Sequence, residues 1–215
     1  KDGSLYTWGY SENGEIGTGS TAYTNSTPTK IMENVIQVEL GVNHSAAITE
    51  DGSLYTWGYN FYGQLGNGTT VMESRPVRVA RNVQSVSLGS GHTTAVSKDG
   101  ALYTWGCNYD GRLGNSSDSN SSTPIKIMSN VVSCAAGYNH TLILKKDGTL
   151  YACGENSSRQ LGDETNTNKL SPVKISVYDR IPVLHSIKEP LIPVGASSTQ
   201  RTAKFTGYSA NGIYN

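Results

Sequence analysis

A motif that returns at a nearly fixed interval constrains this chain more than any other feature of its sequence. The motif reads DGSLYTWGYNFYGQLG at residues 51–66, and related copies occupy residues 2–17, 99–114 and 147–162. The Asp-Gly pairs that open the copies begin at residues 2, 51, 99 and 147, so they lie 49, 48 and 48 residues apart. A fixed period of this length is typical of stacked repeat proteins, in which each unit buries its apolar face only against its neighbours.

Each period contains four short apolar runs separated by turn signals, and none of them keeps helical spacing for more than a few residues. In the second copy we expect strands at residues 44–49, 54–57, 76–79 and 84–88. Four strands of this length in about 48 residues describe one blade of a β-propeller. The chain is therefore predicted to be all-β, with four-stranded blades that form a partial propeller.

Glycines mark the expected turns of each blade. The Asp-Gly pair of each copy predicts a tight hairpin with positive φ at both turn positions. The later Gly-x-Leu/Ile-Gly motif predicts two further turns, with its Leu or Ile plugging the gap between blades. In the fourth copy Arg159 replaces the first of these glycines, which predicts a retained plug and a looser turn. The repeating framework positions include Trp8, Trp57, Trp105, Gly17, Gly66, Gly114 and Gly162.

One histidine per period ends a Gly-x-x-His motif, at His44, His92 and His140. The simplest interpretation is structural: each ring bonds to the backbone of an adjoining strand or blade, beside a Ser or Thr. A ring of metal ligands is the alternative, but carboxylates or thiolates do not accompany the histidines at the same positions. We therefore expect no metal site and no catalytic residue.

Composition argues against several classes of function. The chain has 17 Lys and Arg residues and 17 Asp and Glu residues, so its formal net charge is zero, whereas nucleic-acid binding favours a basic surface. It has no apolar stretch long enough to cross a bilayer. The cysteines form no CxxC pair, and Cys134 and Cys153 read as small core residues, with a disulfide or zinc site as the alternative. We expect no nucleic acid, membrane insertion or cofactor.

Four motifs recur in the same order along the chain: Gly-x-x-His-Ser/Thr, Asp-Gly-x-Leu-Tyr-x-Trp-Gly, Gly-x-Leu-Gly and a later Pro. This combination resembles the regulator-of-chromosome-condensation (RCC1-type) repeat, and the chain resembles a bacterial-type RCC1 repeat protein. The resemblance covers residues 1–177. It implies an RCC1-like β-propeller, usually of seven blades, that serves as a protein-interaction platform. Because the family includes an exchange factor for a small nuclear GTPase, exchange or regulation of a small GTPase is the alternative function.

The aromatic residues outside the repeating framework are the candidate binding residues. Residues 59–62 (YNFY) belong to the part of the motif that changes between copies. If successive blades bring these loops to one rim, the rings form a patch suited to a protein partner of unknown identity, with a glycan as the alternative. Shielding of the blade interface is an equal alternative. The candidates are Tyr10, Tyr59, Phe61, Tyr62 and Tyr109.

These observations predict a non-enzymatic scaffold; a hydrolase or lyase would need an acidic or metal constellation that the motifs do not supply. Residues 1–177 are predicted to hold about three and a half to four blades of a longer array that continues in the N-terminal direction. Residues 178–215 are expected to form a Pro-rich linker and a fibronectin type III-like β segment, or an irregular propeller strand. The Pro-rich exit and Thr/Asn/Ser-rich loops favour a bacterial secreted or cell-surface protein, with the cytoplasm as the alternative.

Overall fold

The computed structural model describes residues 2–176, 207–209 and 212–214. Every regular element within these ranges is a β-strand, so the prediction of an all-β chain is confirmed. The described part accordingly contains no helix that could span a membrane. The chain separates into two units, Lys1–Ser176 and Val177–Asn215, and the repeats lie in the first.

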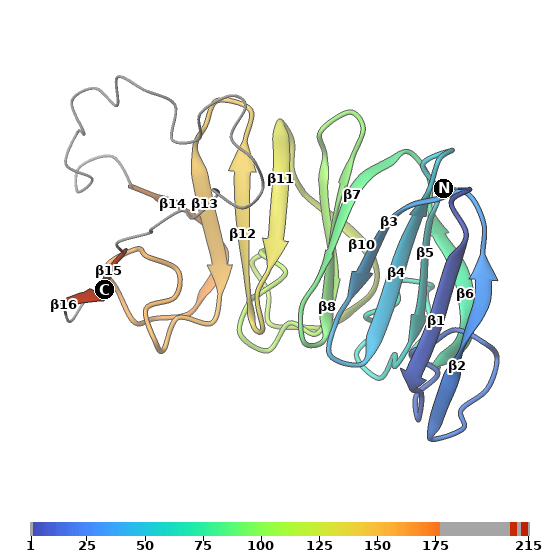
Figure 1. Cartoon of the computed structure of the whole chain (residues 1–215). Helices are drawn as coiled ribbons and strands as arrows, with labels where there is room; N and C mark the ends of the chain where they lie inside the picture. The colour runs from blue at the N-terminus through green and yellow to red at the C-terminus, as the bar shows by residue number, and fades with distance from the viewer. Residues whose placement is uncertain (1, 177–206, 210–211, 215) are drawn as a thin grey trace. The chain divides into compact units, whose positions relative to one another are not determined.

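The strands of the first unit form four antiparallel sheets that follow one another in chain order (Figure 1). The first sheet has two strands, and each of the next three has four strands whose order in the sheet follows the chain. Sheet one contains β1 (Leu5–Tyr10) and β2 (Thr24–Met32). Sheet two contains β3 (Val35–Leu40), β4 (His44–Thr49), β5 (Leu54–Gly58) and β6 (Glu73–Ala80). Sheet three contains β7 (Val83–Leu88), β8 (His92–Ser97), β9 (Leu102–Gly106) and β10 (Ser121–Met128). Sheet four contains β11 (Val131–Ala136), β12 (His140–Lys145), β13 (Leu150–Gly154) and β14 (Lys169–Ile175).

The boundary between blades differs from the predicted one. The sequence grouped residues 84–88 with the second copy, but β7 is the first strand of sheet three, and sheet two begins with β3. The chain passes from β6 to β7 through Asn82, which has a left-handed φ of 59°. A periodic sequence shows the length of its unit and not where the unit starts, because hydrogen bonds between strands set that boundary.

The Asp-Gly hairpins also differ from the prediction, because only the glycine has positive φ. Gly52 has a φ of 80°, whereas Asp51 does not lie in the left-handed region. The Gly52 amide donates to the Thr49 carbonyl at 2.8 Å, and the Thr49 amide donates to the Ser53 carbonyl at 3.0 Å. This is a three-residue loop with a glycine bulge, so a single left-handed residue is sufficient.

The apolar core lies between consecutive sheets rather than within each one. Strand β7 contacts β3 and β4, and β11 contacts β7 and β8. Burial of each large apolar side chain in such an interface contributes about 1.5–3 kcal/mol. The blades therefore stabilise one another as a stacked array should. The cluster between sheets two and three contains Ala46, Ile48, Leu54, Val83, Val86, Leu88, Ala95 and Trp105.

A carbonyl in each Gly-x-Leu/Ile-Gly loop accepts two hydrogen bonds from the next sheet. The Gln64 carbonyl accepts from Trp105 Nε1 at 2.9 Å and from the Thr93 hydroxyl at 2.7 Å. A Cβ added to Gly66 would lie 2.5 Å from Trp105 Nε1, so glycine is required there for the tryptophan to approach. The Glu15 carbonyl likewise accepts from Trp57 and Ser45, and the Arg112 carbonyl accepts from Thr141 and Cys153.

Trp8 lacks this arrangement, because no sheet precedes the first one among the described residues. Its side chain is 60% exposed, whereas Trp57 and Trp105 are buried. The apolar residues between the loop glycines are all buried, as predicted for plugs: Ile16, Leu65, Leu113 and Leu161.

The prediction of a looser turn in the fourth copy is wrong. The Arg159 amide donates to the Asn156 carbonyl at 2.9 Å and the Gly162 amide donates to the Arg159 carbonyl at 3.1 Å, as in the earlier copies. Arg159 adopts a φ of 61°, close to that of the glycine it replaces. In the third copy a Cβ on Gly111 would lie 2.5 Å from Leu170 Cα in the next sheet. Among residues 2–176 no sheet follows sheet four, so the first unit has no equivalent of Leu170 opposite Arg159.

Two buried histidines connect neighbouring sheets. His44 Nε2 lies 3.1 Å from the Thr93 hydroxyl, and His92 Nε2 lies 3.0 Å from the Thr141 hydroxyl. Since each threonine already donates its proton to a loop carbonyl, Nε2 must be the donor and Nδ1 carries no proton. The acceptor is thus a side-chain hydroxyl rather than the expected backbone group. Burial lowers the pKa of His44 to about 4 and that of His92 to about 3.

The second unit is described only at β15 (Gly207–Ser209) and β16 (Gly212–Tyr214), which pair antiparallel. The predicted Pro-rich linker lies outside the described residues. The predicted fibronectin type III-like segment lies outside them as well, apart from these two short strands.

Candidate functional site

Four of the five predicted aromatic residues form one contact cluster. Tyr59, Phe61 and Tyr62 lie in the loop after β5, and Tyr109 lies in the loop after β9. The ring centroids of Tyr62 and Tyr109 are 5.7 Å apart in an edge-to-face arrangement, so the loops of consecutive sheets meet. Tyr62 also packs edge-to-face against Phe61 at 5.2 Å and Tyr59 at 6.4 Å. We refer to these four residues as the aromatic cluster.

Tyr10 lies apart from the aromatic cluster, near the end of β1. Its ring packs against Tyr23 with the centroids 5.3 Å apart, and its hydroxyl donates to the carboxylate of Glu12. This hydrogen bond raises the pKa of Tyr10 to about 12. The structure therefore separates Tyr10 from the other candidates and gives it a local partner.

The aromatic cluster is only partly covered. Phe61 is 64% exposed and Tyr109 is 62% exposed, while Tyr59 and Tyr62 are half-buried. Gly91 leaves room for Tyr62, because a Cβ at residue 91 would lie 3.3 Å from Tyr62 Cδ2. Burial raises the pKa of Tyr62. Exposed rings held by half-buried rings offer a firm apolar surface.

A cavity of about 360 Å³ lies beside the aromatic cluster. Its wall combines aromatic rings with amide, hydroxyl and guanidinium groups from three consecutive sheets. Its volume is near the lower end of the range for ligand pockets, about 300–1,000 Å³. The lining residues are Val42, Asn43, Tyr59, Tyr62, Gln64, Ser90, Gly91, Cys107, Tyr109, Arg112 and Tyr138.

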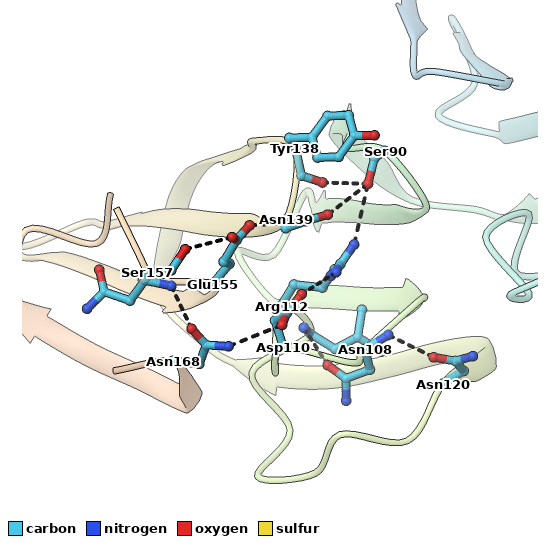
Figure 2. Close-up of polar contacts among 12 residues, drawn as sticks. Ser90, Asn108, Asp110, Arg112, Asn120, Tyr138, Asn139, Glu155, Ser157 and Asn168 are labelled. Atoms are coloured by element: carbon cyan, nitrogen blue, oxygen red, sulfur yellow. Dashed lines mark hydrogen bonds and ion pairs between the residues drawn. The ribbon is translucent and has the colours of Figure 1, made fainter. Parts of the chain in front are cut away.

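Arg112 is the charged residue in this lining, and it is 4% exposed. Its Nη2 pairs with Asp110 Oδ2 at 2.6 Å, and its Nη1 donates to the Ser90 hydroxyl over a long 3.4 Å (Figure 2). Nε is buried and has no hydrogen-bond partner. The Asp110 carboxylate also accepts from Asn168 at 3.1 Å. The guanidinium is therefore held on one side by a fixed carboxylate and keeps unused donors elsewhere.

Ser90 ties this wall to the next sheet. Its hydroxyl lies 2.7 Å from the Tyr138 carbonyl and 3.0 Å from Asn139 Oδ1, and its amide donates to the same carbonyl at 3.1 Å. Asn139 in turn donates to Glu155 (Figure 2). Hydrogen bonds from Ser157 and Asn139, with the nearby Arg112 charge, lower the pKa of Glu155. These contacts fix the loop that carries Tyr138, whose side chain is 68% exposed.

Asn60 is a framework residue, which corrects its assignment to the variable segment. It is fully buried, its Nδ2 donates to the Val71 carbonyl at 2.9 Å, and its Oδ1 accepts from the Leu65 amide at 2.9 Å. Asn108 and Asn156 make the equivalent bonds in the next two copies. The aromatic neighbours of Asn60 therefore lie on a loop whose backbone is held by hydrogen bonds to a buried side chain.

The sequence interpretation missed four lining residues that vary between copies. Gln64 and Arg112 occupy the position between the glycines of Gly-x-Leu-Gly, where the first and fourth copies have Glu15 and Gln160. Ser90 and Tyr138 occupy the position after the glycine of Gly-x-x-His. The signal that could have found them is variation between copies inside motifs that otherwise repeat.

A larger cavity of about 980 Å³ lies between β2 and the β4–β5 side of sheet two. The corresponding gap between sheets two and three measures about 200 Å³. Sheet one has two strands where sheet two has four. The described residues also contain no group of three or more His, Cys, Asp or Glu side chains placed to hold a metal ion.

Stacked four-stranded sheets with loop-borne aromatics define a protein of the β-propeller repeat class. The family description that matches the chain is "RCC1-like domain", over residues 1–199, and the chain belongs to this family. The resemblance inferred from the motifs is thereby confirmed. No curated protein matches the sequence.

Solved structures share this fold at low sequence identity. Human WBSCR16 superposes with a TM-score of 0.73 at 23% identity, over 83% of this chain and 50% of that protein. Yeast RCC1 (Prp20) bound to Kap60 gives a TM-score of 0.71 at 22% identity, over 81% of this chain and 45% of the yeast chain. Prp20p from Saccharomyces cerevisiae, described with its binding to Gsp1p and histones, gives 0.70 at 22%, over 80% and 46%. The chain spans about half the length of these relatives.

Proposed function

We propose that the chain is a non-enzymatic protein-interaction module that binds a protein partner through the aromatic cluster and the adjoining cavity. The observation that carries the proposal is the contact between Tyr62 and Tyr109, which joins aromatic rings from two consecutive loops into one surface. Large aromatic side chains around a pocket are the residues that most often dominate binding energy at protein interfaces.

The framework supports this use of the loops. Asn60 and Asn108 hold both loops from inside, so their conformations do not depend on the exposed rings. Loops held by a rigid scaffold are common positions for binding residues. Binding to preformed loops also avoids part of the entropy cost of ordering them.

A selection from a displayed library of random peptides tests the proposal. Peptides that bind the wild-type chain should bind a triple variant, with Tyr59, Phe61 and Tyr109 replaced by Ala, at least about 100-fold more weakly, because hot-spot truncations each cost about 2 kcal/mol or more. A Tyr10→Ala variant is the matched control, since it removes an exposed tyrosine that packs on Tyr23 and not on the aromatic cluster. Selected peptides that bind the triple variant as well as the wild type would contradict the proposal.

Exchange on a small GTPase is the alternative, and likeness in fold to Prp20p is the observation that favours it. A nucleotide-release assay with a panel of small GTPases separates the two functions. Release accelerated by the chain, and insensitive to the triple Ala substitution, would favour exchange through another face.

A further inference from the structure

We propose that the cavity beside the aromatic cluster binds a carboxylate of the partner, an Asp or Glu side chain, and that Arg112 determines this specificity. The inference rests on the proposed function, because it names the chemical group that the same surface recognises. It concerns the cavity lined by Arg112, Ser90 and Gln64.

The donors of Arg112 are the first part of the argument. A guanidinium has five N–H donors, and here only two have protein partners, one of them the long contact to Ser90. Nε is buried without a partner, which is costly for a charged group. An acceptor that enters from the cavity can accept the hydrogen bond that Arg112 Nη1 now donates to Ser90 over 3.4 Å. A carboxylate is the side-chain acceptor that forms the strongest such bonds with arginine.

The surrounding charge favours a carboxylate over a phosphate. Asp110 already lies 2.6 Å from Nη2, so it offsets part of the Arg112 charge. A dianionic phosphate would face Asp110 with a single arginine beside it, since neither Lys nor a second Arg lines the cavity. A singly charged carboxylate meets about half of that repulsion. The cavity of about 360 Å³ has room for one such side chain.

The repeat itself indicates that the arginine is not needed for folding. The structural bond at this position is made by the carbonyl, which accepts from Thr141 in the next sheet. The equivalent side chains are Gln64 and Gln160, and both copies keep the same turn. Arg112→Gln therefore gives the third loop a side chain that the chain already uses in the same place.

The aromatic residues beside Arg112 indicate which residues flank the carboxylate in the partner. Tyr109 and Tyr138 line the cavity and are largely exposed, so apolar groups of the partner can cover them while its carboxylate points inward. Exclusion of water by such rings strengthens a buried charged hydrogen bond. The expected partner segment has an acidic residue next to aromatic or aliphatic residues.

The test uses the peptides selected from the displayed library on the wild-type chain. We expect an Asp or Glu at one fixed position, and an Asp→Asn or Glu→Gln change there should weaken binding about 10- to 100-fold. Arg112→Gln should weaken binding of the acidic peptide by a similar factor and abolish the difference between acid and amide peptides. Arg159→Gln removes the same charge from the corresponding loop of sheet four and should leave binding unchanged.

The outcomes separate this inference from the proposed function. Peptides that need the aromatic cluster but tolerate both the amide change and Arg112→Gln would overturn the carboxylate site and leave the interaction module intact. Failure to select any peptide that depends on the aromatic cluster would overturn both. A third outcome would also overturn the protein carboxylate as the ligand. In it, no acidic peptide is selected, and the chain instead binds glycans on an array in a way that Arg112→Gln abolishes. Unchanged tryptophan fluorescence verifies that Arg112→Gln is folded.

Discussion

Mild acid should loosen the contacts between sheets two, three and four, because His44 and His92 are buried as neutral rings. Each donates Nε2–H to a threonine of the next sheet and has an Nδ1 that lacks any partner. Protonation would place a charged imidazolium in an apolar interface with no acceptor for the new proton. The folded state therefore disfavours the protonated ring, which is why the pKa of both groups is low.

The magnitude follows from proton linkage. In the unfolded chain a histidine has a pKa of about 6.5, whereas the folded values are about 4 for His44 and about 3 for His92. Below pH 6.5 the unfolded state therefore binds more protons, so stability is fully present above this pH and falls as the pH decreases towards the folded pKa. At pH 5 each histidine lowers the free energy of unfolding by about 2 kcal/mol relative to neutral pH, and the two together by about 4 kcal/mol.

Urea unfolding at pH 7.5 and pH 5, followed by tryptophan fluorescence, measures this effect. Trp105 lies at the interface between sheets two and three that His44 bridges, so it reports directly on the relevant contacts, and Trp57 reports on the other face of sheet two. The wild-type midpoint should fall by more than about 1 M urea between the two pH values.

A His44→Gln, His92→Gln double variant provides the control, because an amide can donate from the Nε2 position and does not titrate. Whatever its stability at pH 7.5, the loss of stability of the double variant between pH 7.5 and pH 5 should be smaller than that of the wild type by about 4 kcal/mol. Carboxylates and the remaining histidines titrate in both proteins and cancel in the comparison. Equal losses in the two proteins would refute the assignment of neutral, desolvated histidines.

Three further changes test the framework and the site. Gly111→Ala should lower the free energy of unfolding by about 1–3 kcal/mol in urea titrations, because the position has a φ of 78° and a Cβ there would press on Leu170. Arg159→Ala at the equivalent turn should cost less than about 1 kcal/mol. Equal costs for the two variants would contradict the role of the next sheet. Asn108→Ala should cost about 2–3 kcal/mol by the same measurement, because the buried Leu113 amide loses its acceptor, and a cost below about 0.5 kcal/mol would argue against an internal role. Phe61→Ala should change the free energy of unfolding by less than about 1 kcal/mol in urea titrations, because the ring is exposed; a larger loss would indicate that the ring shields the blade interface.

Much of the fold could be predicted from the repeating residues alone. The period, the all-β class and the buried plugs such as Leu65 follow from a pattern that recurs in every copy. Repetition constrains what is shared, because each copy must bury the same face against its neighbour. The same logic failed at Arg159, since the need for glycine at that turn comes from the following sheet and not from the turn itself.

The candidate site was predicted in part. Tyr59, Phe61, Tyr62 and Tyr109 could be identified because they are aromatic residues in the part of the motif that changes between copies. Their contact with one another, and the separation of Tyr10, depend on which loops the sheets bring together. Arg112 escaped notice because it stands inside a repeating motif.

The repeating unit follows from the amino-acid sequence, because hydrophobic spacing and glycine positions act locally and recur in each copy. The point where one blade ends and the next begins, and the side chains that meet across it, depend on how the sheets stack. The hydrogen bonds from His92 to Thr141 and from Trp105 to the Gln64 carbonyl join residues 49 and 41 positions apart. No local pattern encodes such contacts, because they exist only when two sheets stack. The cavity that holds Arg112 arises in the same way, from loops of three sheets that meet at one place.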